Sequence, residues 1–122
     1  MKMVLCVSWK VEYYKTESGK TPAYDFIVGL PVKMRAKAFR EIALLEELGT
    51  KIKMPYSRPM GDGIHELRIQ FAGDISRVFY FFFVRRKIIL TNGFIKKTDQ
   101  TPPEELQTAR DYKSSFERRN KT

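Results

Sequence analysis

The stretch IHELRIQFAGDISRVFYFFFVRRKIILTNGFI, residues 64–95, decides the fold class of this chain. Polar and apolar side chains alternate over residues 64–71, which is typical of a half-buried strand. Residues 75–84 are apolar on both faces, which indicates a central strand of a covered sheet. Residues 88–95 predict a third strand, in which Asn92-Gly93 indicates a bulge. Because short turns join these segments, we expect three consecutive antiparallel strands.

Helical patterns precede and follow the strands. Pro22–Leu30 predicts a short amphipathic helix, and residues 31–49 carry the strongest helical spacing of apolar residues. Thr101, with prolines directly after it, predicts a hydroxyl-capped start of a last helix. Met3–Trp9 is typical of a strand, and residues 51–63 are expected to form a loop. The order predicts a small α+β domain, with a mostly antiparallel sheet and helices packed against it.

Length and charge exclude several classes of protein. A chain of 122 residues is expected to be one domain, residues 1–122, with a basic tail that frays from about residue 117. The lone Cys6 excludes an intramolecular disulfide framework and a multi-cysteine zinc site, and the single histidine excludes a histidine metal cluster; we expect no metal and no cofactor. Neither a targeting segment nor a membrane span is evident, which predicts a cytoplasmic protein. The net charge of +9 favours a polyanionic partner, nucleic acid above all.

Basic side chains on the predicted strands are the main candidates for chemistry. Arg68 lies on the polar face of its strand, Arg77 interrupts an apolar strand, and Lys96 and Lys97 follow the last strand. If these strands are neighbours, the cations can converge on one face and hold a phosphate. The alternatives stay open: Arg68 could pair with Glu66, Arg77 could satisfy carbonyls or an acidic helix residue, and the two lysines could be an ordinary charged strand end.

The histidine and the aromatic run favour structural roles. Strict alternation places His65 with Leu67 and Ile69, opposite Arg68, as a partly buried histidine. The aromatic residues 79–83 occupy both faces of their strand, which favours a core over a base-stacking platform.

The segments PMGDGIHELRIQF (59–71), SRVFY (76–80) and GFIKKT (93–98), followed by Thr101-Pro102, resemble the HigB-like, phage-associated branch of the RelE toxin superfamily. The resemblance runs from about residue 24 to residue 109. It implies a twisted sheet with two N-terminal helices packed on one side, a C-terminal helix, and a concave face open to RNA. It also implies a toxin of a type II toxin–antitoxin system: a metal-independent endoribonuclease that cuts translated mRNA in the ribosomal A site. The implied partners are the ribosome and a helix-turn-helix antitoxin.

The resemblance also implies roles for individual residues. Arg68 and Arg77 would stabilise charge on the phosphate. Lys97, with Lys96, would exchange a proton with a reacting oxygen at a pKa lowered by cationic neighbours. Glu66 is an alternative base. The sequence departs from the branch in having histidine before Glu-Leu-Arg and no tyrosine at the start of the last helix, so the general base is left open.

Further basic residues lie in the predicted loop before the first of these strands. Lys51, Lys53 and Arg58 are candidate RNA contacts. An alternative function is a non-catalytic prophage-encoded RNA- or DNA-binding protein, or an inactive toxin fold bound to an antitoxin. The enzyme hypothesis predicts that Arg77→Ala restores growth on overexpression at an unchanged protein level.

Overall fold

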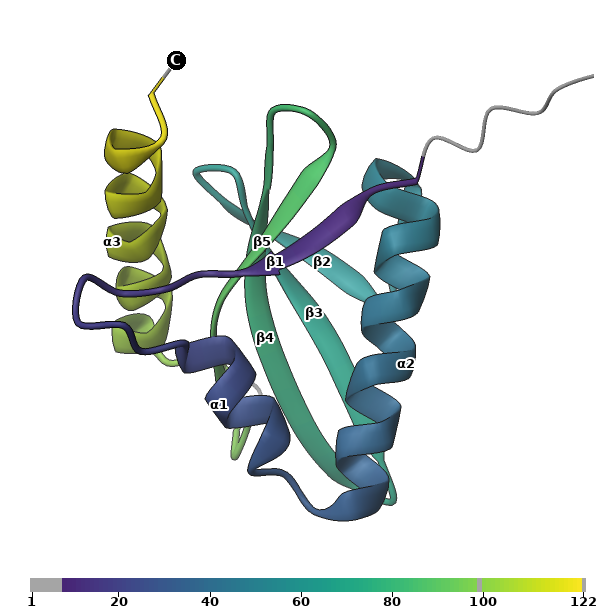
Figure 1. The fold of residues 1–122 in the computed structure, drawn as a ribbon. Coiled ribbons are helices and arrows are strands. Elements are labelled where there is room, and N and C mark those ends of the chain that lie inside the picture. The colour runs from purple at the N-terminus through teal and green to yellow at the C-terminus, as the bar shows by residue number, and fades with distance from the viewer. Residues whose placement is uncertain (1–7, 99, 122) are drawn as a thin grey trace, which may run out of the picture.

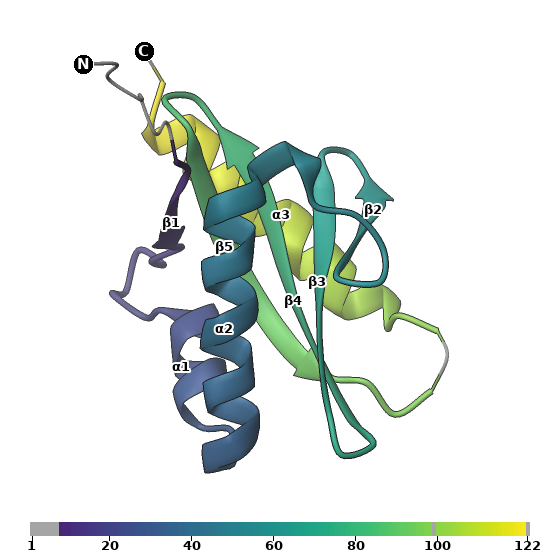
Figure 2. The same ribbon diagram turned by 90° about the vertical axis from the view of Figure 1, so that its right-hand side faces the viewer.

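In the part of the chain that the structure describes, residues 8–98 and 100–121, one five-stranded sheet carries helices on both of its faces (Figures 1 and 2). In this computed structural model the elements are, in chain order, β1 (Lys10–Tyr13), α1 (Pro22–Val28), α2 (Val32–Leu48), the 3₁₀ turn η1 (Gly49–Lys51), β2 (Ser57–Gly61), β3 (Ile64–Phe71), β4 (Asp74–Phe83), β5 (Lys87–Ile95) and α3 (Pro103–Arg119). The predicted α+β class is confirmed. None of these helices is long and apolar enough to span a membrane.

The sheet has the strand order β1-β5-β4-β3-β2. β3, β4 and β5 pair antiparallel, as their short turns predict, and β1 pairs parallel with β5. The predicted bulge in β5 is present. Val78 lies opposite Gly93, whereas Tyr80 lies opposite Leu90, so β5 has one more residue than β4 between the two pairs.

The expectation of a loop over residues 51–63 is wrong for its second half, where β2 pairs antiparallel with β3. This pairing places Arg58 directly opposite Glu66. Pro59 and Gly61 conceal the strand in the sequence because both residue types are depleted in strands. Proline is accommodated because β2 lies at the edge of the sheet.

The two N-terminal helices cover one face of the sheet and build the larger core. Buried side chains of α1 and α2 pack there against alternate residues of β3, β4 and β5: Ala23, Ile27, Met34, Ala38, Ile42, Leu45, Leu67, Ile69, Val78, Tyr80, Ile88 and Leu90. Because side chains alternate along a strand, the even-numbered residues of β3 point to the other face.

Helix α3 covers part of that other face (Figure 1). Ala109 packs with Phe79 and Phe94, and the ring of Phe116 lies 5.6 Å from that of Phe81. The resemblance implied a concave face open to RNA. Instead, Phe79 and Phe81 on this side of β4 are buried under α3, so the part of the face that α3 covers is closed to a ligand.

The start of the C-terminal helix differs from the prediction. Thr101 does not cap it: the helix begins at Pro103, and its N-terminus has no side-chain capping hydrogen bond. The helix extends to Arg119, and fraying of the tail from about residue 117 stays a prediction. The strand predicted over Met3–Trp9, which includes Cys6, lies almost entirely outside the described residues.

Candidate functional site

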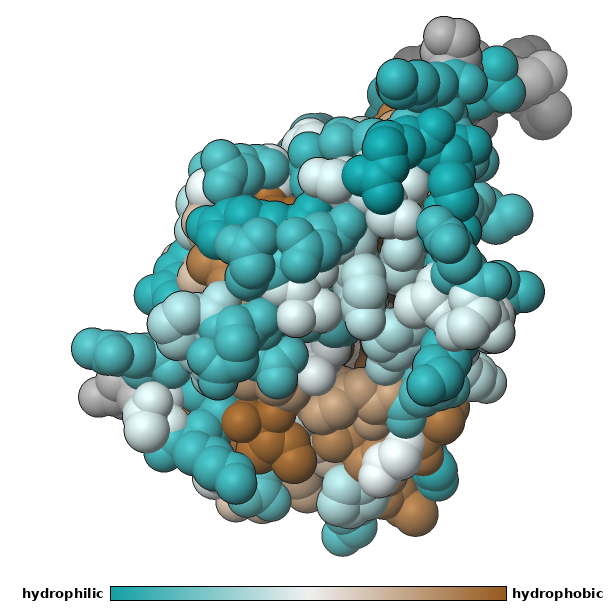
Figure 3. Space-filling model, turned by 90° about the vertical axis from the view of Figure 1, so that its left-hand side faces the viewer, coloured by the Kyte–Doolittle hydropathy of each residue, from teal (hydrophilic) through white to brown (hydrophobic). Residues whose placement is uncertain are grey.

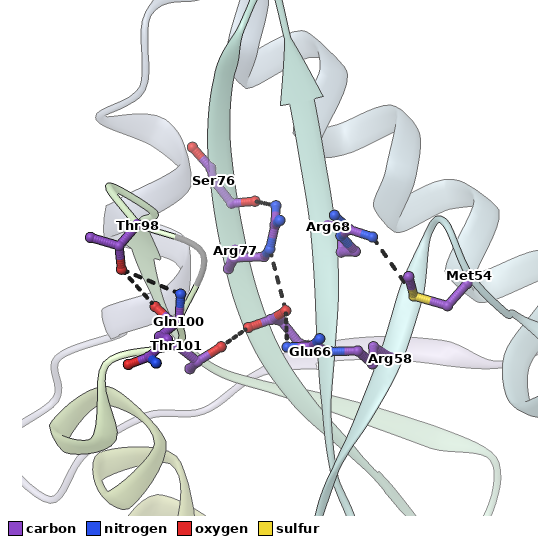
Figure 4. Close-up of polar contacts among 9 residues, drawn as sticks. All are labelled: Met54, Arg58, Glu66, Arg68, Ser76, Arg77, Thr98, Gln100 and Thr101. Carbon is purple, nitrogen blue, oxygen red and sulfur yellow. Dashed lines mark hydrogen bonds and ion pairs between the residues drawn. The ribbon is translucent and has the colours of Figure 1, made fainter.

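The register of the sheet brings charged side chains from four segments to the start of α3. Arg58 of β2 lies opposite Glu66 of β3, and Arg68 of β3 lies opposite Arg77 of β4. Lys96 follows β5 and continues its pairing, since its backbone N–H donates to the carbonyl of residue 75 at 2.8 Å. We call Arg58, Arg68, Arg77 and Lys96, together with Glu66, the basic cluster; Figure 4 draws all of these residues except Lys96.

Glu66 is the acidic centre of the basic cluster. It is 1% exposed, and its Oε1 lies 3.3 Å from Nε of Arg77 and 3.8 Å from Nη2 of Arg58. Its Oε2 accepts a hydrogen bond of 2.9 Å from the hydroxyl of Thr101 (Figure 4). The carboxylate therefore connects β2, β4 and the segment before α3 to β3.

Arg77 is an internal cation. It is 1% exposed, its Nη1 donates to its neighbour's carbonyl, that of Ser76, at 3.2 Å, and its ion pair is with Glu66. Burial lowers the pKa of Arg77; Glu66 opposes this shift, and Arg68 adds to it. Direct contact of Arg77 with a phosphate, which the resemblance implied, does not fit this burial. The structural alternative describes its position better, although the acid comes from a neighbouring strand and not from a helix.

Arg68 and Arg58 are the more accessible arginines of the basic cluster. The side chain of Arg58 is 44% exposed. Arg68 is half-buried, and its Nη1 lies 3.7 Å from the sulfur of Met54 (Figure 4). Among the described residues, the ion pairs of Glu66 are with Arg58 and Arg77, so the alternative in which Arg68 pairs with Glu66 is not the arrangement found.

Lys96 belongs to the basic cluster by its electrostatics. Partial burial lowers its pKa, and the positive charges of Arg77, Arg58 and Arg68 lower it further, while Glu66 opposes the shift. The sequence analysis expected cationic neighbours to lower the pKa of Lys97, together with Lys96; in the structure this effect is found at Lys96. Lys97 is the next residue and is exposed.

The remaining sequence candidates lie elsewhere. His65 is on the opposite face, as predicted, with its ring stacked 5.3 Å from that of Tyr80, and burial lowers its pKa. Lys51 ends η1, Lys53 follows it, and both are exposed. In the described part of the chain neither forms an ion pair with the basic cluster, so Arg58 alone of these three loop cations joins it.

Two features of the site could not be found by sequence reasoning. Arg58 was a candidate only as a loop residue, because β2 was not predicted. Thr101 was assigned to a helix cap, and no sequence pattern signals its hydrogen bond to Glu66, 35 residues away.

The arrangement is suited to an anion with several acceptor oxygens. Four cations surround one carboxylate, and three of them, Arg58, Arg68 and Lys96, keep exposed surface. Guanidinium and ammonium groups that converge in this way hold phosphate oxygens by charge-assisted hydrogen bonds. Among the described residues, no group of three or more His, Cys, Asp and Glu side chains could hold a metal ion.

Comparison with known proteins agrees with the family resemblance of the sequence. No curated protein matches the chain. The family model described as phage derived protein Gp49-like (DUF891) matches residues 25–114, which include all of the basic cluster and most of α3. Since this match covers well over half of the sequence, the chain belongs to the phage-derived Gp49-like family.

Proposed function

We propose that this protein is a toxin of a type II toxin–antitoxin pair, which cleaves translated mRNA in the ribosomal A site and binds the scissile phosphodiester at the basic cluster. The Gp49-like family consists of RelE/HigB-like, toxin-type proteins, which supports the toxin class. The observation that carries the proposal is the convergence of Arg58, Arg68 and Lys96 around a buried Glu66–Arg77 pair. A helix-turn-helix antitoxin is the proposed partner.

Cleavage proceeds by attack of a ribose 2′-OH on the adjacent phosphorus. The hydroxyl gives its proton to an acceptor, the new O–P bond closes a cyclic phosphate, and the 5′-oxygen leaves and takes up a proton. Arg58 and Arg68 stabilise the charge that grows on the phosphate oxygens. Lys96 takes the proton from the 2′-hydroxyl or gives one to the leaving oxygen; partial burial and cationic neighbours lower its pKa and so favour the exchange.

Glu66 and Arg77 are positioning residues in this mechanism. The Glu66 carboxylate already contacts Arg77 and accepts a hydrogen bond from Thr101, which leaves it poorly placed to take a proton from RNA. Without a paired histidine and carboxylate, the isolated site is expected to be slow. The ribosome would supply the missing positioning of mRNA, an effect that can be worth roughly 7–11 kcal/mol.

Mapping of transcript 5′-ends after induction tests the proposal. We expect new ends that keep the reading frame and are confined to translated regions. Arg68→Ala and Lys96→Ala should each reduce these ends at least tenfold at an unchanged protein level. Arg40→Ala is the matched control, since Arg40 is exposed on α2, which covers the opposite face of the sheet.

The alternative, a non-catalytic RNA-binding protein, is favoured by one observation: the most buried cation and the only acid of the basic cluster neutralise each other. It predicts that induction leaves transcript ends unchanged, while purified protein binds RNA in a way that depends on Arg68. That pair of results would replace the enzyme with a binding protein.

A further inference from the structure

The turn between β4 and β5 carries two arginines in an unfavourable backbone conformation. Arg85 has φ of 64° and Arg86 has φ of 57°, both in the left-handed region. Glycine, asparagine and aspartate are the usual residues at such positions of a hairpin turn, because other side chains crowd the backbone there. Tight hairpin turns use this backbone conformation, so the fold accounts for it, but the fold gives no reason for arginine at both positions.

A shallow groove of about 620 Å³ lies beside this turn. Phe83 and Val84, at the end of β4, supply its apolar part, and Val84 is 58% exposed. Arg118 and Lys121, at the C-terminal end of α3, supply its positive part. The groove thus places apolar side chains next to cations, the combination that holds a nucleotide's base and its phosphate together.

Several cations at this end of the molecule have no internal partner. Within the described residues, no ion pair joins an acid to Arg85, Arg118 or Lys121. The acid that lines the groove, Glu117, is already paired with Lys113 at 3.0 Å. The helix dipole gives a structural reason for a cation near the end of α3, but it gives none for arginine at the turn.

The groove is separate from the basic cluster. Seven residues along β4 separate Arg77 from Val84, a distance of about 23 Å in an extended strand. In Figure 1 the β4–β5 turn and the end of α3 both lie at the top of the view, whereas the segment that joins β5 to the start of α3 lies near the bottom. Seen from the side of α3, the upper surface is mostly hydrophilic (Figure 3).

We propose that the tip of the β4–β5 turn and the C-terminal turn of α3 form a second binding surface for RNA, which contacts backbone phosphates at a distance from the basic cluster. This inference rests on the proposed function, because it takes RNA as the ligand. Arg85, Arg118 and Lys121 contact phosphates, and the apolar side chains of Phe83 and Val84 receive a base. RNA is the proposed occupant because the groove sets an apolar part beside cations, as a base and its phosphate require.

The backbone strain gives a direct test. Arg85→Gly removes a charge and also relieves the left-handed conformation, so the melting temperature should not fall. Binding of a fluorescein-labelled single-stranded RNA oligonucleotide, measured by anisotropy on the full chain, should weaken roughly three- to tenfold. The slope of log affinity against log salt should become shallower by about 0.7 for each phosphate that the variant no longer neutralises. Adding Arg118→Gln should double that change.

Two control variants test whether the effect of Arg85→Gly comes from this surface. One measures the effect of losing a positive charge elsewhere, and the other measures the effect of relieving a left-handed turn residue elsewhere. Arg40→Gln removes an equal charge from α2, and Ala72→Gly relieves a left-handed residue in another turn, at φ of 51°, without a change of charge. Both should bind RNA like the wild type. Equal weakening by Arg40→Gln, or unchanged affinity of Arg85→Gly, would overturn the inference. Because this assay measures binding, it stays informative if 5′-end mapping shows no cleavage; the enzyme proposal then fails alone.

Discussion

At Glu66 a single buried carboxylate faces more positive charge than it can neutralise. The side chains of Glu66 and Arg77 are each 1% exposed, and their closest atoms are 3.3 Å apart. Oε1 of Glu66 and Nε of Arg77 have no well-aligned hydrogen bond among the described residues. Such a pair adds little net stability, yet removing one partner leaves an uncompensated buried charge. A substitution of Glu66 or Arg77 alone therefore changes the stability of the fold as well as the chemistry of the site.

Arg77→Ala should destabilise the fold by about 3–5 kcal/mol, because Glu66 is then buried without its partner. The double variant Glu66→Gln/Arg77→Met should recover a large part of that stability, since neither charge remains. Urea unfolding measures both. Arg68→Ala, on the accessible side of the basic cluster, serves as control and should cost less than about 1 kcal/mol. In the growth assay suggested by the sequence, Arg77→Ala would therefore restore growth through loss of folded protein. Arg68→Ala is the better variant for that assay.

His65 should make the free energy of unfolding depend on pH. Burial lowers the pKa of His65 in the folded state, so below about pH 6.5 the unfolded chain binds more protons at this residue than the folded one. Stability is therefore lost as pH falls from about 6.5 towards the lowered folded pKa. His65→Phe should remove this part of the dependence, because it keeps an aromatic ring against Tyr80. Urea unfolding of both proteins at about pH 8 and about pH 5.5 makes the comparison; parallel losses in the two would contradict it.

Between elements, α1 approaches the bulge of β5 very closely. A Cβ at Gly93 would overlap the ring of Phe26, so this glycine is required for packing and not for a turn. The bulge and the ring together set how closely α1 lies on the sheet.

Gly93→Ala should cost about 1–3 kcal/mol by overpacking. Adding Phe26→Leu to Gly93→Ala should restore part of the lost stability, because the smaller side chain leaves room for the new Cβ. Thermal unfolding compares the variants. If the single and double variants lose stability additively, the contact does not limit the packing.

Prediction from sequence succeeded where the signal was periodic. The strands and the bulge were predictable because each signal lies within the sequence of the strand itself: the alternation in β3, the apolar run of β4 and the glycine in β5. β2 was not, because Pro59 and Gly61 interrupt any period. Within the site, the placement of Arg68 on the face opposite His65 followed from alternation. The burial of Arg77 and its pairing with Glu66 depend on the register between strands and on the docking of α3, which no local pattern encodes.

Over the whole molecule, positive charge exceeds negative charge, and two groups of cations lie near opposite ends of α3. The chain has 23 Lys and Arg against 14 Asp and Glu. The basic cluster lies beside the start of α3, and the proposed second surface lies beside its end. Long-range attraction of a polyanion and mutual repulsion within the fold both follow from this distribution.

Salt should therefore act on binding and on folding in opposite directions. Raising the concentration from about 50 to about 200 mM should weaken RNA binding roughly tenfold or more if three phosphates are contacted. Over the same range the unfolding free energy should stay constant or rise, because salt screens surface repulsion more than the buried Glu66–Arg77 pair. Anisotropy and urea titrations on one preparation give both values. A parallel decline would show that the two effects share a cause in unfolding.

The Thr101 hydroxyl, expected to begin a helix, donates its hydrogen bond to Glu66 in the sheet. The same carboxylate lies 3.8 Å from Arg58, the most solvent-accessible arginine near it. An anion that binds Arg58 and moves it away from Glu66 leaves Oε1, among the described residues, paired with Arg77 alone. Oε2 keeps its hydrogen bond from Thr101. An anion at Arg58 therefore acts on the same carboxylate that anchors the segment before the C-terminal helix.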